Sequence, residues 1–597
     1  MSRRWVVSLA LVAAVLGGCG VATETGVVRD GDGPRGQSDP GGVTVRPPQR
    51  EDAPNDPRDF IDNYLRSASP DPGLSIERLR RYLLPGVGPG WTPDPLVTVV
   101  RKVDDYRVTP LAGGGAEVVV HLQPVGTLTE FGAVDPPANR NRIDYGFTVV
   151  PSPEADQRGL FLTNPRPQIL LLDTALAKSA LYEPYPIYFW DNDNQVLVPD
   201  VRYLSKSIPE QQRPTEVLRW LLNGPSSLLR QTAHGLPAGT ELRGSGVYLQ
   251  DDRLMVNLSA KATGLADQLM PQLRWSLWRL YSGKLGLLTE GVRAATDDSP
   301  EKYRWANATA ALPTVPEVMC VTGGVVVGHC DTAGPGAPAD QVPGPMNTAV
   351  VAAAIGTSPN GPIRSAVVRT EGRNSRRLWV GTAGPPAVYG ATDLVAPTMS
   401  RPVWLRPGNA NPVTQTGLVA AKGQLHRFVA SPSATVTATL PVPEENQTSN
   451  LTGITAVAAA PDARRIALVA GGRLYVAPLL VSSGTVSVGA ARRLDTILRD
   501  LTAVSFKTEG SLLVAGQDGS GSRVGEVSLD GMLDSPYERN LGTVKITQLV
   551  AYPDDPVDQR LRGFVMVEAD GRAAKAFQTS LADLDQTTPK SAPFYVD

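Results

Sequence analysis

The sequence predicts a multidomain chain in which two α+β modules precede an all-β propeller of about six blades. Three observations support this prediction. The chain has 597 residues, enough for about three or four domains on the usual ~150-residue prior. Helix-like and strand-like segments alternate before residue 313, and after it short apolar strands are interrupted by glycine turns at a regular interval.

The N-terminus has the pattern of a lipoprotein export signal. Arg3 and Arg4 precede a mostly apolar run from Trp5 to Leu16, and Leu16-Gly17-Gly18-Cys19 matches a bacterial lipobox. We therefore expect residues 1–18 to be a cleaved signal peptide and Cys19 to be the lipid attachment site. An uncleaved transmembrane anchor is the alternative, but this apolar run is too short to span a ~30 Å hydrocarbon core. The predicted location is the cell membrane, lipid-anchored, on its extracytoplasmic face.

Composition argues against nucleic acid as a partner and against an internal membrane-spanning segment. Lys plus Arg number 57 against 59 Asp plus Glu, and the arginines are spread along the chain. Such a balance does not favour nucleic-acid binding. The longest internal apolar run, from Ala349 to Ile355, is far too short to cross a bilayer. Membrane attachment is therefore expected from the lipid alone.

A tether and a first module are expected next. Residues 19–57 are rich in Gly, Pro, Asp and Arg and should form a lipidated flexible tether, placing the first domain on the order of 35 Å from the membrane. Residues 58–177 predict an α+β module with two short amphipathic helices and a curved sheet, an order that suggests the cone-shaped kind of module that lines a cavity. Its expected strands are Val97–Val100, Glu117–Leu122, Tyr145–Val150 and Gln168–Leu172.

The second module, residues 183–312, has a clear order of elements. Strands at Tyr185–Trp190 and Val196–Tyr203 flank a turn, Pro214 opens a helix that stops at Gly224, and a second hairpin precedes a helix over Leu265–Ser282. Several of its segments resemble the spore-germination-type (GerMN) module; they are Ile187-Tyr188-Phe189, Leu221-Leu222-Asn223-Gly224-Pro225, Leu236-Pro237-Ala238-Gly239-Thr240 and Val256-Asn257-Leu258-Ser259. That resemblance implies a scaffold or binding unit without an assigned catalytic centre.

Residues 313–597 predict the propeller. Glycine turns between apolar strands recur about every 50 residues, as expected for four-stranded blades; they end at Gly324, Gly372, Gly423, Gly472, Gly519 and Gly571. The segment Ala460-Pro461-Asp462-Ala463 resembles a turn of secreted propellers that carries glycine where this chain has Ala463. Since glycine there usually supplies a positive φ, a different turn type is expected at Ala463.

Cys320 and Cys330 are candidates for a disulfide. They remain after Cys19 is assigned to the anchor, and thiols of exported proteins tend to oxidise. Closing this short loop would stabilise the chain by roughly 2.5 kcal/mol. A two-residue turn at Gly323-Gly324 would however place Cys320 opposite Val327 and Cys330 about 10 Å further along, beyond disulfide reach. A bulge at Gly328 or a wider turn would be needed.

The whole order of parts resembles the actinobacterial lipoprotein LpqB family. The lipobox, tether, α+β module, GerMN-like module and propeller follow one another as in that family. The resemblance implies an accessory lipoprotein that binds the extracytoplasmic sensor domain of the Mtr two-component histidine kinase and modulates its signalling in growth and cell-envelope maintenance. A cell-wall or glycan-binding lipoprotein is the alternative, and an envelope hydrolase a distant one.

An enzyme, a metal site and a cofactor are not expected. The four histidines, His121, His234, His329 and His426, lie far apart in the sequence and form no ligand pair at helical spacing. The segment Asp191–Asn194 begins like a calcium loop, yet Val196 and Arg202 stand where glycine and glutamate are required, so a solvated turn is expected. Trp275 and Trp278 could form an aromatic contact face, although inward packing is the more common role of such residues.

Overall fold

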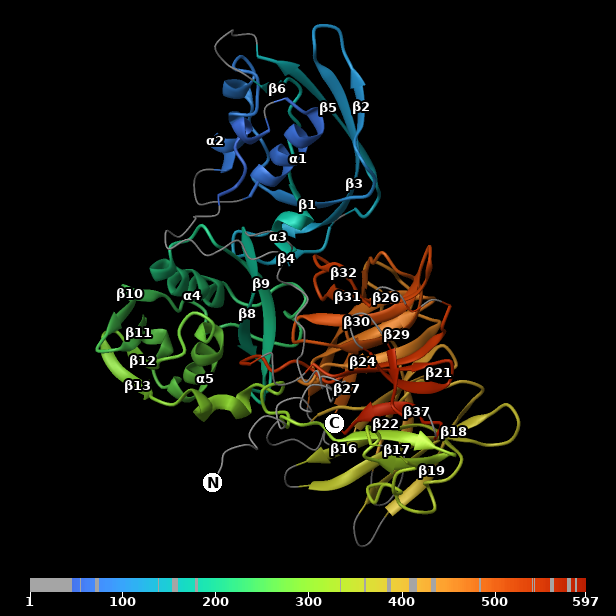
Figure 1. Cartoon of the computed structure of the whole chain (residues 1–597). Coiled ribbons are helices and arrows are strands. Elements are labelled where there is room, and N and C mark those ends of the chain that lie inside the picture. Colours follow the sequence, from blue (N-terminus) through green and yellow to red (C-terminus); the bar gives the residue numbers. More distant parts are fainter. Residues whose placement is uncertain are drawn as a thin grey trace, which may run out of the picture. The chain divides into compact units, whose positions relative to one another are not determined.

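The structure is a computed structural model that describes residues 46–596 apart from 54, 70–74, 138, 153–158, 178–180, 333, 359–360, 384–387, 407–415, 431–435, 483–484, 539–540, 542, 559–562, 577–580 and 586–587. The signal peptide, Cys19 and most of the expected tether therefore lie outside the described residues. Residues 44–597 form one compact unit, shown in Figure 1. Within it, two α+β parts precede a ring of sheets, which confirms the predicted fold class.

The first part combines two helices with a sheet. Helix α1 (Pro57–Ser67) begins where the Asp56 side chain accepts hydrogen bonds from the backbone N–H groups of Arg58 and Asp59, at 2.7 and 3.2 Å. Helix α2 spans Ser75–Arg80. The sheet has the order β6-β5-β3-β1-β7, with β2 and β4 paired to β3. Its strands are β1 (Val97–Lys102), β2 (Arg107–Pro110), β3 (Ala116–Leu128), β4 (Val134–Asp135), β5 (Ile143–Pro151), β6 (Leu160–Leu162) and β7 (Ile169–Leu172).

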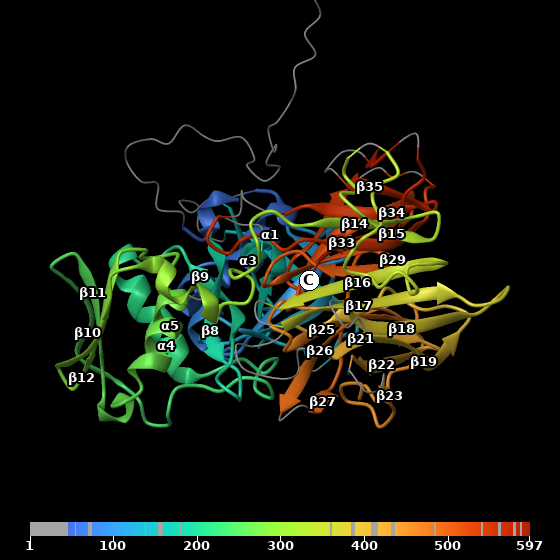
Figure 2. The same ribbon diagram turned by 90° about the horizontal axis from the view of Figure 1, so that it is seen from below.

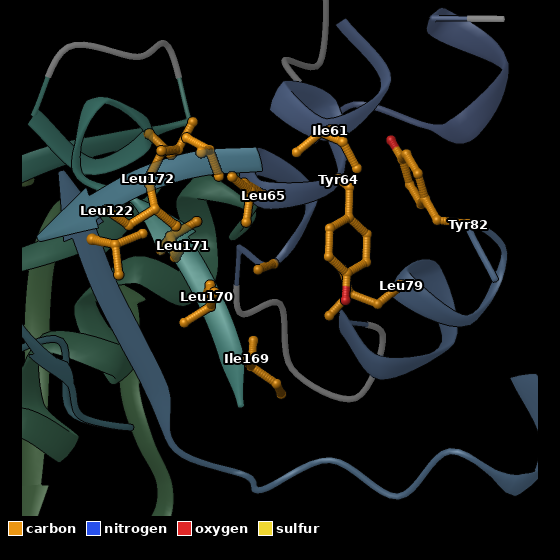
Figure 3. Packing of buried hydrophobic residues seen from close by; sticks show 14 of the residues in the cluster. Ile61, Tyr64, Leu65, Leu79, Tyr82, Leu122, Ile169, Leu170, Leu171 and Leu172 are labelled. Carbon is orange, nitrogen blue, oxygen red and sulfur yellow. The ribbon is translucent and has the colours of Figure 1, made fainter. Parts of the chain in front are cut away.

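Apolar side chains fill the space between these helices and the sheet. Ile61 and Leu65 of α1 and Leu79 near the end of α2 are buried in one cluster with Leu171 of β7, as Figure 3 shows from close by. Such a filled interior packs like a protein core. The four strands predicted from the sequence are confirmed. Between the helices and the sheet, where a cavity was expected, the structure has a packed hydrophobic core.

Residues 46–53, which we expected in the tether, contact this first part. Pro47 and Ala53 are buried, and the Ser67 hydroxyl donates to the Pro48 carbonyl at 2.5 Å. The Arg50 guanidinium lies over the Phe161 ring, 4.3 Å from its centroid. A chain segment held by such contacts is ordered, so a flexible tether would end before residue 46.

The second part contains a long hairpin, two helices and a four-stranded sheet. The hairpin is β8 (Tyr182–Trp190) with β9 (Leu197–Ser205), and the sheet has the order β10-β11-β12-β13. Helix α4 (Arg213–Asn223) has Pro214 in its first turn and ends at Gly224, whose φ is 89°, as predicted. The remaining elements are β10 (Leu242–Gln250), β11 (Arg253–Leu258), α5 (Ala266–Leu277), β12 (Lys284–Thr289), β13 (Val292–Asp297) and the 3-10 helix η5 (Pro300–Ala306).

One detail of the second part differs from prediction, and a second was not predicted. Helix α5 ends at Leu277, earlier than the expected Ser282, and it contains Pro271. The hairpin β8–β9 is buried along nearly its whole length on both faces. Both views place it between the helices α4 and α5 and the ring of sheets (Figures 1 and 2). A strand covered on both faces does not alternate between apolar and polar residues, and the buried Asp200 and Arg202 of β9 pair with each other at 2.7 Å.

The ring contains six sheets among the described residues, one for each predicted blade. Their orders are β15-β14-β37, β16-β17-β18-β19, β20-β21-β22-β23, β24-β25-β26-β27 with β28 on β26, β29-β30-β31-β32 and β33-β34-β35-β36. The strands are β14 (Val318–Thr322), β15 (Val325–Gly328), β16 (Val350–Ser358), β17 (Gly361–Thr370), β18 (Arg376–Ala383), β19 (Val388–Ala396), β20 (Val403–Trp404), β21 (Thr416–Ala421), β22 (Gln424–Val429), β23 (Val436–Leu440), β24 (Ile454–Ala459), β25 (Arg465–Ala470), β26 (Arg473–Ser482), β27 (Thr485–Val488), β28 (Arg492–Leu494), β29 (Arg499–Phe506), β30 (Ser511–Asp518), β31 (Gly521–Ser528), β32 (Asp534–Glu538), β33 (Ile546–Ala551), β34 (Val565–Ala569), β35 (Arg572–Ala576), β36 (Leu581–Asp583) and β37 (Ser591–Tyr595).

The last strand closes the ring. Strand β37 pairs with β14, far earlier in the chain, through Val318 with Tyr595 and Met319 with Phe594. It also lies against β16 of the next blade and β33 of the previous one. The first blade therefore takes its inner strand from the C-terminus, which fastens the two ends of the propeller together.

The recurring glycines all occupy the same kind of turn. Each lies between the second and third strands of its blade, counting β37 as the first strand of the first blade. Five of the six have positive φ, between 71° and 81°, and only Gly519 does not. The periodic signal in the sequence therefore reports one backbone requirement repeated around the ring.

The turn at Ala463 corrects a prediction. Ala463 has φ 52°, so the backbone keeps the left-handed conformation although glycine is absent. Its methyl group is fully buried in the core of the blade. Burial of the methyl group offsets part of the cost of about 1–2 kcal/mol for an L-residue in this conformation.

Cys320 and Cys330 are joined in a disulfide, with their Cα atoms 5.8 Å apart. The pairing in the hairpin is the one that raised the geometric objection, since Cys320 lies opposite Val327. The chain leaves the strand after Gly328, because His329 has φ 53° and the Cys330 N–H donates back to the Val318 carbonyl at 3.2 Å. This turn brings Cys330 within disulfide reach.

Candidate functional site at the module junction

A buried ion pair joins the hairpin β8–β9 to the propeller. The Arg464 guanidinium donates through Nε and one terminal nitrogen to the same oxygen of Asp191, at 3.0 and 2.5 Å. Both side chains are almost fully buried. The other Asp191 oxygen accepts from the backbone N–H groups of Gln195 and Val196. Asp191 is thus buried, which corrects the expectation of a solvated turn for this residue, whereas Asn192 and Asn194 of the same turn are exposed.

A buried glutamate forms a second connection close by. Glu509, in the loop between β29 and β30, accepts from the Tyr188 hydroxyl at 2.6 Å and from the Asn307 amide at 2.8 Å. The Arg465 guanidinium donates to the Glu509 backbone carbonyl at 2.6 Å and to Asp462. Burial raises the pKa of the Glu509 carboxyl above its ordinary value.

Two further contacts fix the neighbouring segments. Arg304 of η5 donates to Asp555, in the loop between β33 and β34, at 2.6 Å. The Tyr203 hydroxyl of β9 donates to Asp530 of the β31–β32 turn at 2.8 Å. Since three blades contribute residues to these contacts, the second part and the propeller are held at several points.

The first part is tied to the same region of the propeller. Arg101 of β1 donates to Asp173 at 2.6 Å and to the Gly531 carbonyl at 2.9 Å. Arg202 of β9 donates to the Phe131 carbonyl at 3.0 Å. The hairpin β8–β9 is therefore the element where all three parts of the chain meet.

A cavity of about 220 Å³ lies at this junction. One wall is apolar and comes mainly from the hairpin, with Pro184, Pro186 and Val201. The other comes from the propeller and carries carboxylates and hydroxyls. Its lining residues are Pro184, Pro186, Val201, Tyr203, Arg279, Thr508, Glu509, Gly510, Ser511, Glu526, Ser528, Leu533, Asp554, Asp555 and Pro556. Concave sites with an apolar wall and a few polar groups are typical of ligand-binding positions.

The sequence pointed to some of these residues but not to their association. The segment Asp191–Asn194 stood out as calcium-like and the Asp462-Ala463 turn as propeller-like, and the ion pair of Asp191 with Arg464 joins them. Glu509 carried no signal, because an isolated glutamate in a turn is indistinguishable from a solvated one. Its burial depends on Tyr188 and Asn307, which are remote in sequence.

The tryptophans and one histidine considered in the sequence analysis pack within the protein. Trp275 is buried and its indole N–H donates to the Tyr303 carbonyl at 2.8 Å, whereas Trp278 is half-buried beside it. His426 is buried, and burial lowers the pKa of its imidazole. The described ranges contain no group of three His, Cys, Asp or Glu side chains that could hold a metal ion. No helix in those ranges is long and apolar enough to cross a membrane.

Family comparisons agree with this architecture. Residues 334–565 match the family model of the lipoprotein LpqB beta-propeller domain, and residues 186–292 match that of sporulation and spore germination. Lipoprotein LpqB of Nocardia farcinica is 24% identical over 580 residues, covering 89% of each chain. The chain is therefore similar to lipoprotein LpqB over most of its length. LpqB of Mycolicibacterium smegmatis is 26% identical over 411 residues, covering 65% of this chain and 68% of its own.

Solved structures give only a weak likeness. TolB from Acinetobacter baumannii has a TM-score of 0.27 and 9% identity, covering 51% of this chain and 75% of its own. The relation to LpqB therefore depends on the sequence matches and on the order of the parts.

Proposed function

We propose that the chain is a lipid-anchored accessory lipoprotein on the extracytoplasmic face of the cell membrane. It binds the sensor domain of the Mtr two-component histidine kinase and modulates its signalling in growth and cell-envelope maintenance. The observation that carries this proposal is homology to LpqB lipoproteins over up to 89% of the chain, together with the lipobox that ends at Cys19.

The structure supports an accessory role by its arrangement. The GerMN-type part and the propeller are joined through buried contacts such as Asp191 with Arg464. A joined unit of this kind offers a broad, fixed surface to a partner, and preorganised surfaces lose little conformational freedom on binding.

The anchor is tested by a matched pair of cysteine variants. Cys19→Ser removes the thiol that would carry the lipid, so the protein should leave the membrane fraction and lose its fatty-acid mass. Cys320→Ser, which removes a different cysteine, should stay in the membrane fraction. Retention of the Cys19→Ser variant in the membrane would contradict the lipid anchor.

The partner is tested by crosslinking in intact cells followed by identification of the neighbouring protein. The expected neighbour is the Mtr sensor kinase, and the full chain in detergent should copurify with its extracytoplasmic domain. Crosslinks that contain only other envelope proteins would overturn the assignment.

A second candidate is binding of cell-wall glycan, and one observation favours it. The Trp305 side chain is 47% exposed and lies 6.1 Å from Trp190, ring centroid to ring centroid. Exposed indoles are common in contact surfaces. Retention of the chain on insoluble peptidoglycan, lost in Trp305→Ala, would support this candidate over the kinase.

A further inference from the structure

We infer that the cavity between the hairpin β8–β9 and the propeller binds an alkylammonium group, meaning a positively charged amine at the end of an apolar stem. This inference concerns a ligand site and goes beyond the proposed function. It follows from the volume of the cavity, the division of its walls and the orientation of two ion pairs.

The apolar wall suits the stem of such a ligand. Pro184, Pro186 and Val201 come from the hairpin, and Leu533 and Pro556 from the propeller, so apolar surface is present on both sides. Burying a methylene group against such surface contributes about 0.8 kcal/mol. A volume of about 220 Å³ accommodates a chain of several methylene groups.

The polar wall favours a cation. Three acidic residues besides Glu509 line the cavity, Glu526, Asp554 and Asp555, against one basic residue, Arg279. Glu509 is not counted as a negative charge, because its carboxyl accepts from Tyr188 and Asn307 and burial raises its pKa. Glu526 pairs with Lys507 at 2.8 Å and Asp555 with Arg304 at 2.6 Å. In both pairs the acidic residue is one of those that line the cavity, and its basic partner is not.

The position of these two pairs determines the electrostatic potential inside the cavity. A ligand inside the cavity therefore contacts Glu526 and Asp555, and it does not contact Lys507 or Arg304. Charges interact more strongly in a partly desolvated cavity than in bulk water. An ammonium is therefore attracted and a carboxylate of the same length repelled.

The closeness of the two walls indicates that the cavity has a set width. A side-chain atom added at Gly510 would lie 2.6 Å from a Val201 methyl group, so glycine is required where the propeller loop meets the hairpin. Gly510 and Val201 both line the cavity, so this contact sets the spacing of its two walls at that point. A site whose walls are already fixed loses little conformational freedom on binding.

The direct test is calorimetric titration of the full chain in non-ionic detergent. Cadaverine (1,5-diaminopentane), which carries an ammonium at each end of its stem, is the probe, with pentanoate and 1-pentanol as five-carbon controls that have a negative charge or none. We expect cadaverine to bind with a Kd at least tenfold lower than either control. Equal binding of all three probes, or no heat from cadaverine up to millimolar concentration, would overturn the inference.

Two variants should act in opposite directions. Glu526→Gln removes a lining carboxylate and leaves Lys507 unneutralised, so the Kd of cadaverine should rise about tenfold or more. Lys507→Gln removes the cation behind the wall, so the Kd should fall. A folding defect would weaken binding in both variants. Asp518→Asn, at the far end of β30 in the same blade, is the control and should leave the Kd unchanged.

A second titration distinguishes the source of the amine. N-acetyl-lysine methylamide presents the same group as a lysine side chain with a peptide backbone. If it binds as tightly as cadaverine, the cavity accepts a lysine of a partner protein. If cadaverine alone binds, the cavity takes a free amine. Failure of the kinase crosslink would leave either result intact.

Discussion

At the scale of single residues, the buried charges of the junction carry the sharpest consequences. Asp191 and Arg464 are both almost completely removed from water. Burying either charge alone would cost much free energy, and the pair is stable because each charge neutralises the other. The pair is therefore a point at which a small change has a large effect.

We expect Asp191→Asn to lower the free energy of unfolding by about 3–5 kcal/mol, because it leaves the Arg464 guanidinium buried without a counter-charge. Chemical denaturation, followed by tryptophan fluorescence, measures the change. Asp193→Asn, in the same turn but with no ion pair among the described residues, is the control and should change stability by less than about 1 kcal/mol. Similar losses in both variants would contradict this role of the pair.

Glu509 predicts a dependence of stability on pH. Burial raises its pKa in the folded chain, whereas in the unfolded chain a glutamate has its ordinary pKa of about 4.3. The folded state therefore binds the proton more tightly. The resulting stability is fully present below the unfolded pKa and is lost as pH rises through the raised folded pKa.

The Glu509→Gln variant cannot titrate at this position. Its stability should fall less than that of the parent protein as pH rises from about 4.3. Thermal unfolding at a series of pH values gives both curves, and parallel curves would show that Glu509 does not contribute. Glu371→Gln, on the exposed loop between β17 and β18, is the control and should follow the parent.

At the scale of elements, the blade turns test the meaning of the glycine repeat. Gly571 and Gly519 occupy equivalent turns, and an added Cβ would meet no atom within 4 Å at either. They differ in φ, which is +77° at Gly571 and outside the left-handed region at Gly519.

Gly571→Ala should therefore destabilise the chain by about 1 kcal/mol, because alanine disfavours the left-handed region. Gly519→Ala should be neutral or stabilising by up to about 1 kcal/mol, since it restricts only the unfolded chain. The difference between the two denaturation midpoints is the measurement. A loss of equal size in both variants would mean that space, and not φ, selects glycine in these turns.

The same comparison explains what could be predicted from the sequence. The repeat was visible because five of the six turns need a residue with positive φ locally, whatever the rest of the ring does. The turn at His329 could not be predicted from the sequence. Its positive φ occurs at a histidine, and histidine does not mark a left-handed turn as glycine does. The Asp191–Arg464 pair joins segments 273 residues apart, and no local pattern reports such a contact. The cavity depends on that same non-local packing.

At the scale of the whole molecule, the hairpin β8–β9 determines how the parts respond together. It is covered by α4 and α5 on one side and by the propeller on the other. Removing either partner would expose an apolar face of the hairpin to water. Each partner is thus stabilised by the presence of the other.

We therefore expect the second part of the chain, from β8 to η5, and the propeller to unfold in one calorimetric transition. The double variant Arg464→Ala/Arg304→Ala removes both cations that pair across the junction, with Asp191 and Asp555. Because the buried carboxylates then oppose docking of the two parts, the transition should split in two. Arg523→Ala, which breaks a half-buried pair within one blade, should keep a single transition. Two separate transitions in the parent chain would mean that the parts touch at the junction without stabilising each other, since coupling requires that loss of one part raise the free energy of the other.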